Sequence, residues 1–358
     1  METNDVITQL QELTTRPMTR RRPIVLMGLL AGVAGVPALL AACGSATTTT
    51  QGPAGGTAAG AAVPAVPTVA VATPQMAVPT AANAAPVTAG PISVTAKEDG
   101  DNLLFDVDRL AIPAGPVQVT FKNAGKMVHE VYLYPVQDLT SFLAQRRAGV
   151  HAEEADYIKH IVGNVEDADP GKGGEFQGTL TPGFYELACF VMSKRPDGST
   201  YVHFDKGQSV TIAAIGPGGP SADVLTPASE MKVQMLPGEG DLARSWLFVP
   251  DRLVVTAGKV TFTVTNHMDE EHDFVVYRLG DISTLVANRL AGKKSEDDYK
   301  SVHGDEIMED LPKGQTWTRT MDLTPGMWAA ACFMVSKSAD GSSFLHRDRA
   351  QRFTFVVK

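Results

Sequence analysis

The sequence predicts an all-β protein built from two tandem β-sandwich domains, and three observations lead to this prediction. Apolar and polar residues alternate along several short segments, which is typical of half-buried strands. Pro-Gly pairs, which favour turns, stand at 182–183 and 325–326, each just before a strand-like segment that contains a cysteine. The folded part of the chain also matches itself at a constant spacing. The candidate strands are residues 117–121, 129–134, 184–190, 260–264 and 353–357.

The repeat covers residues 91–215 and 228–358, which match at a constant offset of 143. A fixed offset over such a length indicates an internal duplication, and its period is far too long for a solenoid. We therefore expect each copy to be a domain with its own core. The matches include Asp108-Arg109-Leu110 with Asp251-Arg252-Leu253, Leu180-Thr181-Pro182-Gly183 with Leu323-Thr324-Pro325-Gly326, and Asp197-Gly198-Ser199 with Asp340-Gly341-Ser342.

Two segments depart from the strand pattern. Residues 138–160 and 281–303 are rich in Leu, Ala, Arg and Glu and occupy equivalent places in the two copies. Their composition favours helix over strand. We expect one helical insertion in each sandwich.

Composition limits the functions that the chain can serve. Its 358 residues suffice for two ordinary domains, and 44% are hydrophobic, so each domain can bury a core. The formal net charge of −9 argues against a general nucleic-acid binder, which needs a basic face. Three cysteines are too few for a disulfide scaffold.

The amino terminus has the features of an export signal. Three arginines at 20–22 precede an uncharged stretch of 19 residues, 24–42, which ends just before Cys43. The preceding Leu-Ala-Ala and Cys43 resemble a bacterial lipobox, in which the cysteine is lipidated and becomes the first mature residue. We expect a lipid anchor at Cys43, with the body held at the outer face of the cytoplasmic membrane.

Three alternatives stay open for this region. The stretch is long enough to remain as an uncleaved single-span anchor. The arginines suit a twin-arginine route as well as the general secretory route. The start of translation is either Met1 or Met18.

A linker follows the signal. Residues 44–90 contain no charged and no aromatic residue, so they cannot build a packed core. As a flexible tether they would reach roughly 35–40 Å. The predicted organisation is a signal peptide at 1–42, a lipidated cysteine and linker at 43–90, domains at 91–215 and 228–358, and a joint at 216–227.

Histidine and cysteine recur together in the repeat. Each copy offers one histidine after an Asn-containing strand, then a cysteine at a strand end, then a second histidine. Two imidazoles and one thiolate are the ligands of a mononuclear type 1 copper site. The candidate ligands are His129, Cys189 and His203 in the first copy and His272, Cys332 and His346 in the second.

These motifs resemble the cupredoxin family of blue copper proteins over nearly the whole of both folded copies. The family pattern is an Asn and then a His, a Pro-Gly turn into a strand that ends in Cys, and then a His followed by an axial residue. The resemblance implies a Greek-key β-sandwich in each copy and up to two coppers, one per domain. The pattern is present as Asn123, His129, Pro182-Gly183, Cys189 and His203, and again as Asn266, His272, Pro325-Gly326, Cys332 and His346.

Two features depart from the commonest family pattern. The axial residue is usually Met, but both copies carry Gln five positions after the second His, at Gln208 and Gln351. An axial Gln is stellacyanin-like, and its amide oxygen favours Cu(II). The loop from Cys to His also has 13 intervening residues in each copy, which is long for the family.

The function implied by the resemblance is one-electron transport without catalysis. We expect a membrane-tethered carrier that exchanges electrons with redox proteins of a membrane electron-transport chain. The resemblance also implies that His203 and His346 present ring edges near the surface as exits for the electron. The acidic charge would suit a basic docking partner.

Several alternatives stay open on the sequence alone. The chain could be a copper-delivery lipoprotein with the same ligands, or a metal-free descendant of the fold. Cys189 and Cys332 could pair as a disulfide in an exported protein. Arg347 and Arg349 follow His346 closely and oppose a bound cation unless they point away.

A two-domain copper oxidase or nitrite reductase is the enzyme alternative. In such enzymes a His beside the Cys commonly links the type 1 copper to a second kind of copper. Here the neighbours of the cysteines are Ala188 and Phe190, and Ala331 and Phe333. The sequence therefore favours a carrier over an enzyme.

Overall fold

The computed structural model describes residues 90–137, 143, 146, 160–238, 246–293, 307–337, 341 and 343–358. The predicted signal peptide, Cys43, the linker and most of the first helical insertion lie outside these residues. Among the residues described, no helix combines the length and the apolar character needed to cross a bilayer.

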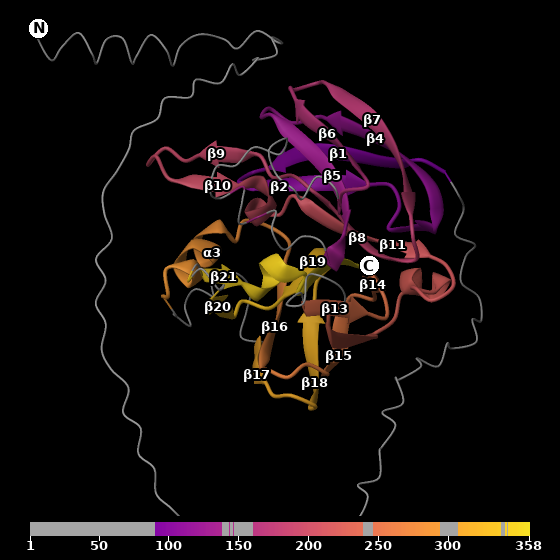
Figure 1. Ribbon diagram of the computed structural model, residues 1–358, viewed down its shortest axis with the longest axis vertical. Coiled ribbons are helices and arrows are strands. Elements are labelled where there is room, and N and C mark those ends of the chain that lie inside the picture. The colour runs from indigo at the N-terminus through magenta and orange to yellow at the C-terminus, as the bar shows by residue number, and fades with distance from the viewer. Residues whose placement is uncertain are drawn as a thin grey trace, which may run out of the picture. The chain divides into compact units, whose positions relative to one another are not determined.

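The described strands form two sets of sheets, drawn from indigo to red and from orange to yellow in Figure 1. The first set, here the N-terminal sandwich, has a four-stranded sheet in the order β2-β1-β4-β7 and a five-stranded sheet in the order β3-β11-β8-β5-β6. β9 and β10 form a separate two-stranded ribbon. The strands are β1 (Ile92–Asp99), β2 (Asn102–Val107), β3 (Ala111–Pro113), β4 (Gly115–Asn123), β5 (His129–Pro135), β6 (Gly163–Ala168), β7 (Gly173–Leu180), β8 (Gly183–Ala188), β9 (Met192–Lys194), β10 (Thr200–Val202) and β11 (Ser209–Ile215).

The second set, here the C-terminal sandwich, repeats this arrangement. Its sheets have the orders β13-β12-β15-β18 and β14-β22-β19-β16-β17, and β20 pairs with β21. Each position in the strand order matches the corresponding position in the N-terminal sandwich. The strands are β12 (Glu230–Pro237), β13 (Trp246–Pro250), β14 (Val254–Val255), β15 (Gly258–Asn266), β16 (His272–Arg278), β17 (Ile307–Leu311), β18 (Thr316–Leu323), β19 (Gly326–Ala331), β20 (Val335–Lys337), β21 (Ser343–Leu345) and β22 (Arg352–Val357).

Each sandwich encloses a core between its two sheets. In the N-terminal sandwich, Val119 and Phe121 of β4 pack in one cluster with Leu133 of β5 and Leu187 of β8. The C-terminal sandwich has an equivalent core, in which Phe262 of β15 lies 5.7 Å from Phe274 of β16 between ring centroids. The all-β, two-sandwich fold class predicted from the sequence is confirmed.

The five-stranded sheets are buried on both faces, which the simple alternation did not predict for every strand. β4 and β15 alternate between buried and more exposed residues, as expected. In β22, however, residues 352–355 are all buried, although its sequence reads as an alternating strand. The outer face of each five-stranded sheet is covered by a second apolar cluster, which includes Phe190 and Phe204 in one sandwich and Phe333 in the other.

A helix covers part of this outer face in the C-terminal sandwich. α3 (Ser283–Leu290) falls within the predicted insertion 281–303, and its Leu285 and Val286 are buried in the outer cluster. The helix is shorter than the expected segment, whose residues 294–303 lie outside the described part. Of the other insertion, only residues 143 and 146 between 138 and 159 are described, and both are helical.

The two sandwiches meet through buried polar contacts. The N–H of Thr211 donates to Thr354 Oγ1 (2.6 Å), and the N–H of Thr354 donates to Thr211 Oγ1 (2.8 Å). Arg352 donates to Ser209 Oγ (2.7 Å) and forms a buried ion pair with Glu186. The segment predicted as the joint carries a short helix, η5 (Ala222–Leu225), whose Val224 is buried against the C-terminal core.

Candidate metal centres

The three predicted ligands of the first copy lie together. His203 Nδ1 is 3.2 Å from His129 Nδ1 and 3.4 Å from Cys189 Sγ. The three donor atoms all lie within 4.8 Å of one another, and all three residues have 0% exposure. The three residues lie up to 74 positions apart in the sequence. The fold therefore brings one donor atom from each of them into a closed site.

The ends of three strands position this group. His129 begins β5, where a bulge shifts the register against β6, and bulges re-aim side chains. Cys189 follows β8, and its N–H donates to the carbonyl of Gln208 (3.1 Å). His203 begins the short helix η4 (His203–Lys206), and its N–H donates to the carbonyl of Val191 (2.9 Å). Each ligand is thus held through its backbone by a neighbouring strand or loop.

The asparagine of the sequence motif closes the loop before the first histidine. Asn123 Nδ2 donates to the carbonyls of Met127 and Ala168, both at 2.7 Å. Its Oδ1 accepts the N–H of Gly125 (2.8 Å). The side chain is fully buried, so it replaces the missing backbone pairing of this loop and fixes where β5 begins.

The second group repeats this geometry. His272 Nδ1 is 3.1 Å from His346 Nδ1, and Cys332 Sγ is 3.9 Å and 3.6 Å from those two atoms. The register of β16 against β17 shifts just after His272. Asn266 donates to the carbonyls of Glu270 and Leu311, the contacts equivalent to those of Asn123.

The protonation states fit a soft or borderline metal cation. Burial and, to a smaller extent, the nearby His129 lower the pKa of His203 to about 3. Burial likewise lowers the pKa of His272 to about 4 and that of His346 to about 3. These imidazoles are neutral at pH 7, the form that binds metals.

The cysteines need a cation to become thiolates. Burial raises the pKa of both Cys189 and Cys332 well above its ordinary value, and nearby Glu130 and Asp273 raise it further. The N–H of Glu130 donates to Cys189 Sγ (3.5 Å), and the N–H of Asp273 donates to Cys332 Sγ (3.3 Å). A metal cation would supply the missing positive charge, so the donor set fits the copper that the resemblance implies.

Both predicted axial residues lie at these groups. Gln208 Oε1 is 2.9 Å from His129 Nδ1. Gln351 is fully buried; its backbone N–H donates to the carbonyl of His346 (3.3 Å), and its backbone carbonyl accepts the N–H of Cys332 (3.0 Å). Gln351 Oε1 has no hydrogen-bond partner among the described residues, so this oxygen is available to a cation.

The sequence did not identify the groups that bind Nε2 of His129, His203 and His346, while Nε2 of His272 has no partner among the described residues. Glu98 Oε1 lies 3.1 Å from His129 Nε2, and the Glu98 carboxylate also accepts the N–H of Lys126. Ser193 Oγ lies 2.8 Å from His203 Nε2, and Ser336 Oγ lies 2.7 Å from His346 Nε2. The repeat contains the signal for these serines, because they stand 143 residues apart.

The rings of His203 and His346, expected near the surface, are not themselves exposed to solvent. His203 is 0% exposed and His346 is 1% exposed, because Ser193 and Ser336 cover their outer nitrogens. The exposed apolar residues near the two groups are instead Val128, Met192 and Val335, at 36%, 37% and 40% exposure. Met192 and Val335 occupy equivalent positions in the repeat.

Of the two arginines that follow His346, Arg347 is paired with a carboxylate, whereas the charge of Arg349 adds to burial in lowering the pKa of His346 and so opposes a cation there. Arg347 turns into the interface and pairs with Asp205 of the N-terminal sandwich, with Nη1 2.8 Å from Oδ1. Arg349 stacks over Phe344, with Cζ 3.5 Å from the ring centroid. The pairing neutralises the charge of Arg347.

The two groups differ in their surroundings. Trp246 packs over the second group, with ring centroids 4.0 Å from His346 and 5.6 Å from His272. The equivalent residue of the first copy is Leu103. The disulfide alternative is wrong in this structure, because Cys189 and Cys332 are both free and buried.

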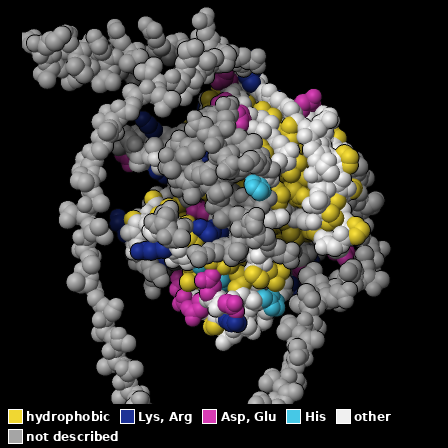
Figure 2. Space-filling view, viewed as in Figure 1, with side chains coloured by type: hydrophobic (Ala, Val, Ile, Leu, Met, Phe, Trp, Pro, Cys, Tyr) yellow, Lys and Arg dark blue, Asp and Glu magenta, His cyan; other side chains and the backbone are white. Residues whose placement is uncertain are grey.

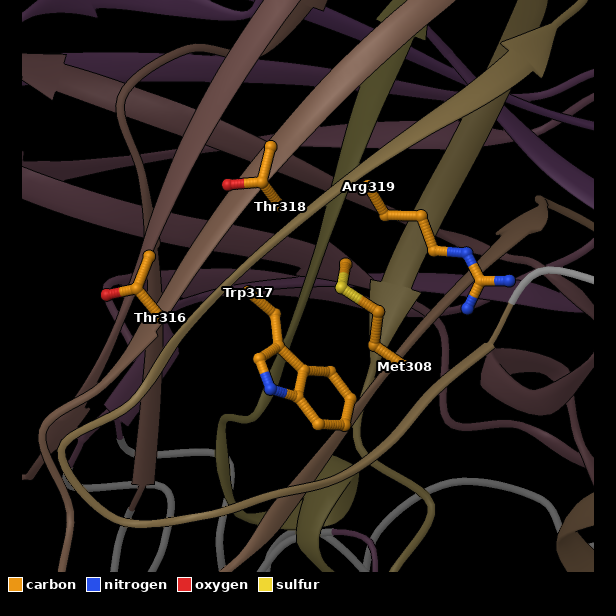
Figure 3. Close-up of a pocket in the computed structure, with 5 residues that line it drawn as sticks. All are labelled: Met308, Thr316, Trp317, Thr318 and Arg319. Carbon is orange, nitrogen blue, oxygen red and sulfur yellow. The ribbon is translucent and has the colours of Figure 1, made fainter.

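A surface depression on the C-terminal sandwich is separate from these groups. In Figure 3 the indole of Trp317 lies beside Met308. Its lining contains no histidine, cysteine or carboxylate, so it offers no metal site. The lining residues are Met308, Thr316, Trp317, Thr318 and Arg319.

Comparison with known proteins gave similar solved structures only. No protein-family model matches the chain, and no curated protein matches it. A reduced auracyanin from Roseiflexus castenholzii is 21% identical, with 35% of this chain and 97% of that chain covered and a TM-score of 0.27. Auracyanin A, a blue copper protein from Chloroflexus aurantiacus, is 20% identical, with 35% and 100% covered and a TM-score of 0.28. A multicopper oxidase is 13% identical, with 75% and 88% covered and a TM-score of 0.26. We draw no functional conclusion from likenesses at these TM-scores.

Proposed function

We propose that the protein is a copper protein that carries single electrons between redox partners through two type 1 centres. The observation that carries this proposal is the buried donor set of two imidazoles and one thiol, formed twice. His129, Cys189 and His203 would hold one copper, and His272, Cys332 and His346 the other. Gln208 and Gln351 would be the weak axial ligands.

The burial of the donors supports electron transport over copper delivery. All six are at most 1% exposed, so a copper acceptor cannot reach them without opening the site. An electron needs no such opening. A closed site also leaves no free position for a substrate, which supports a carrier over an enzyme.

When bound, copper supplies a one-electron couple between Cu(I) and Cu(II). The chain keeps the ligand positions the same in both states. Asn123 and the bulge fix His129, while Glu98 and Ser193 hold the outer nitrogens of the two rings. Such outer contacts orient ligands and limit the rearrangement that accompanies a change of charge.

The proposed setting is the outer face of the cytoplasmic membrane, with Cys43 as the lipid anchor and redox proteins of a membrane chain as partners. Exposed Val128 and Met192 near the first group offer an apolar contact for docking. Acidic residues 269–271 are exposed just before His272, and Figure 2 shows acidic side chains gathered on the lower part of the molecule. This charge favours a basic partner at the second group.

Copper stoichiometry with visible and EPR spectra of the full-length chain tests the proposal. We expect an intense thiolate-to-copper band and about two coppers per chain, since each sandwich holds one donor set. Cys189→Ser and Cys332→Ser should each remove one copper and its share of the colour. His160→Ala serves as the control, because His160 is an exposed histidine outside both groups.

Other outcomes select among the alternatives. A colourless chain that takes up no copper would overturn the proposal and favour a metal-free descendant. Copper that is bound without the band and passes rapidly to a chelator would favour delivery. Additional copper with a different EPR signal would favour an enzyme.

A further inference from the structure

The residues that directly follow the ligands of the two groups meet in the interface between the sandwiches. Phe204 follows His203, Arg347 follows His346, and Phe333 follows Cys332. Arg347 Cζ lies 5.0 Å from the ring centroid of Phe204 and 5.8 Å from that of Phe333. These distances place the guanidinium in contact with a ring from each sandwich.

This cluster is closed to solvent. Phe204 is 1% exposed, and Phe333 and Arg347 are both 0% exposed. Asp205, also from η4, pairs with Arg347 and balances its charge. The cluster is therefore a buried connection in which Asp205 balances the charge of Arg347, and a second paired arginine, Arg352, also lies over the Phe204 ring at 4.3 Å.

Further contacts fix the two ligand segments against each other. The N–H of Ile282 donates to the carbonyl of Asp205 (2.9 Å), and Lys206 Nζ lies 3.0 Å from Asp281 Oδ2. A Cβ on Gly207 would lie 3.0 Å from the nitrogen of Gly280, so the two backbones are in close approach. η4, which starts with a ligand of the first group, is thus held directly on the C-terminal sandwich.

We propose that Phe204, Arg347 and Phe333 connect the two metal sites and that an electron passes between them through this cluster. This inference rests on the proposed function. The transfer oxidises Cu(I) to Cu(II) at one site and reduces Cu(II) to Cu(I) at the other, and no bond forms or breaks. The chain would then act as an internal relay, which receives an electron from a donor protein at one site and releases it to an acceptor protein at the other.

Flash photolysis of the copper-loaded full-length chain tests the relay. A photoexcited flavin delivers less than one electron per chain, and the absorbance is followed while the electron redistributes. All variants carry Gln351→Met, which changes one axial ligand so that the bands of the two sites differ. We expect a first-order redistribution whose rate does not depend on protein concentration.

Two substitutions interrupt the cluster in different ways. Phe204→Leu removes a ring and keeps the ion pair, and Arg347→Met together with Asp205→Asn removes both charges. Each should slow the redistribution at least tenfold while copper stoichiometry and both absorption bands stay unchanged. Thr354→Val is the matched control, since it removes an interface hydrogen bond outside the cluster and should leave the rate unchanged.

Metal-free protein provides a second readout. Thermal unfolding of each metal-free variant shows how far the substitution weakens the interface. A slower transfer caused by a broken path can then be distinguished from one caused by a weakened interface. If Thr354→Val lowers the unfolding temperature as much as Phe204→Leu without slowing the transfer, the relay is supported.

Failure of the relay and failure of the proposed function give different results. A chain that binds no copper overturns both. Two type 1 coppers with no redistribution, or with a rate proportional to protein concentration, overturn the relay alone. An unchanged rate in both cluster variants also overturns it.

Discussion

Asn123 shapes the first group through three side-chain hydrogen bonds and is itself fully buried. It joins the loop before His129 to the end of β6 through two donated bonds and one accepted bond. Asn123→Ala should lower the free energy of unfolding by about 2–3 kcal/mol, because it leaves buried carbonyls without donors. Urea unfolding of the metal-free chain measures this change.

The matched control is Asn164→Ala, which removes a partly buried bond to Glu166 Oε1 (2.8 Å) and should cost less than about 1 kcal/mol. Equal costs for the two substitutions would mean that Asn123 does not close the loop in the way described.

Glu98 gives a second prediction about a single residue. Its carboxylate holds His129 Nε2, so Nδ1 faces the other donors. Glu98→Ala should weaken copper binding at the first group by about 10–100-fold, as is typical when an outer partner of a ligand is lost. Competition with a chelator measures the affinity for copper. The measurement is made in a Cys332→Ser background, so that only the first group binds copper with its full donor set.

Glu175→Ala is the control for this measurement, because Glu175 is a carboxylate of the same sandwich that bonds Gln118 (2.9 Å) on the surface. An affinity that is the same in the two variants would exclude a positioning role for Glu98.

The grouping of the six histidine and cysteine donors was predictable from the sequence, but the residues that support them were only partly so. The ligands recur with the repeat, and imidazole with thiolate is a recognisable donor set. Glu98 stands 31 residues before His129, whose ring it holds. This contact depends on where β1 ends relative to the loop before β5, which the sequence does not reveal. The one available signal was Asp241, a carboxylate at the equivalent position of the repeat.

At the scale of elements, the end of η4 depends on a glycine. Gly207 has φ of +99°, and a Cβ there would also approach the backbone of Gly280. Gly207→Ala should lower the free energy of unfolding by about 2 kcal/mol, because both the left-handed conformation and the close approach oppose a side chain. Chemical denaturation measures the difference.

The repeat supplies the control. The equivalent residue is Ala350, which already has φ of +70°. Ala350→Gly should change stability by less than about 1 kcal/mol, because relief of strain offsets the lost methyl group and the added freedom of the unfolded chain. A larger loss at Ala350 than at Gly207 would contradict this account.

The contact between η4 and the start of α3 should depend on pH. Burial raises the pKa of Asp281, but hydrogen bonds from Ser283 and Lys206 outweigh it and lower the pKa below 3.8. Asp281 therefore contributes stability that is present above this value and is lost as the pH falls through the lower folded-state pKa. Between pH 5 and pH 2 the wild type should lose more stability than Asp281→Asn, as measured by urea unfolding. Parallel losses would contradict the prediction.

The elements themselves were predicted unevenly, for a physical reason. Strands with one solvated face, such as β4, show the alternation on which the prediction rests. β22 and β16 are buried on both sides, so their sequences indicate strand without indicating what covers the outer face. That cover is made by α3 and by the other sandwich, whose contacts no local pattern contains.

At the scale of the whole molecule, several interface contacts join residues that are equivalent in the repeat. Thr211 and Thr354 exchange hydrogen bonds, and Ser209 meets Arg352, each pair being 143 residues apart. Contact between equivalent residues is the mark of a twofold arrangement. The repeat was visible in the sequence, but the meeting of its equivalent positions depends on how the outer faces pack.

The pair of Arg352 and Glu186 breaks this symmetry, because the residue equivalent to Glu186 is Ala329. Both charged side chains are 1% exposed, so each depends on the other. Arg352→Met should lower the free energy of unfolding by about 3–5 kcal/mol, because it leaves a buried carboxylate without its cation. Adding Glu186→Gln should recover part of this loss, since the amide needs no counter-charge and still accepts the hydroxyl of Thr211.

A double-mutant cycle by chemical denaturation at pH 7 measures the coupling. If the effects of Arg352→Met and Glu186→Gln simply add, the pair does not act as a unit. A strong coupling means that either sandwich, separated from the other, exposes one unpaired charge of this pair. The two sandwiches would then be stable chiefly as one body, which is the condition for a fixed path between the two proposed metal sites.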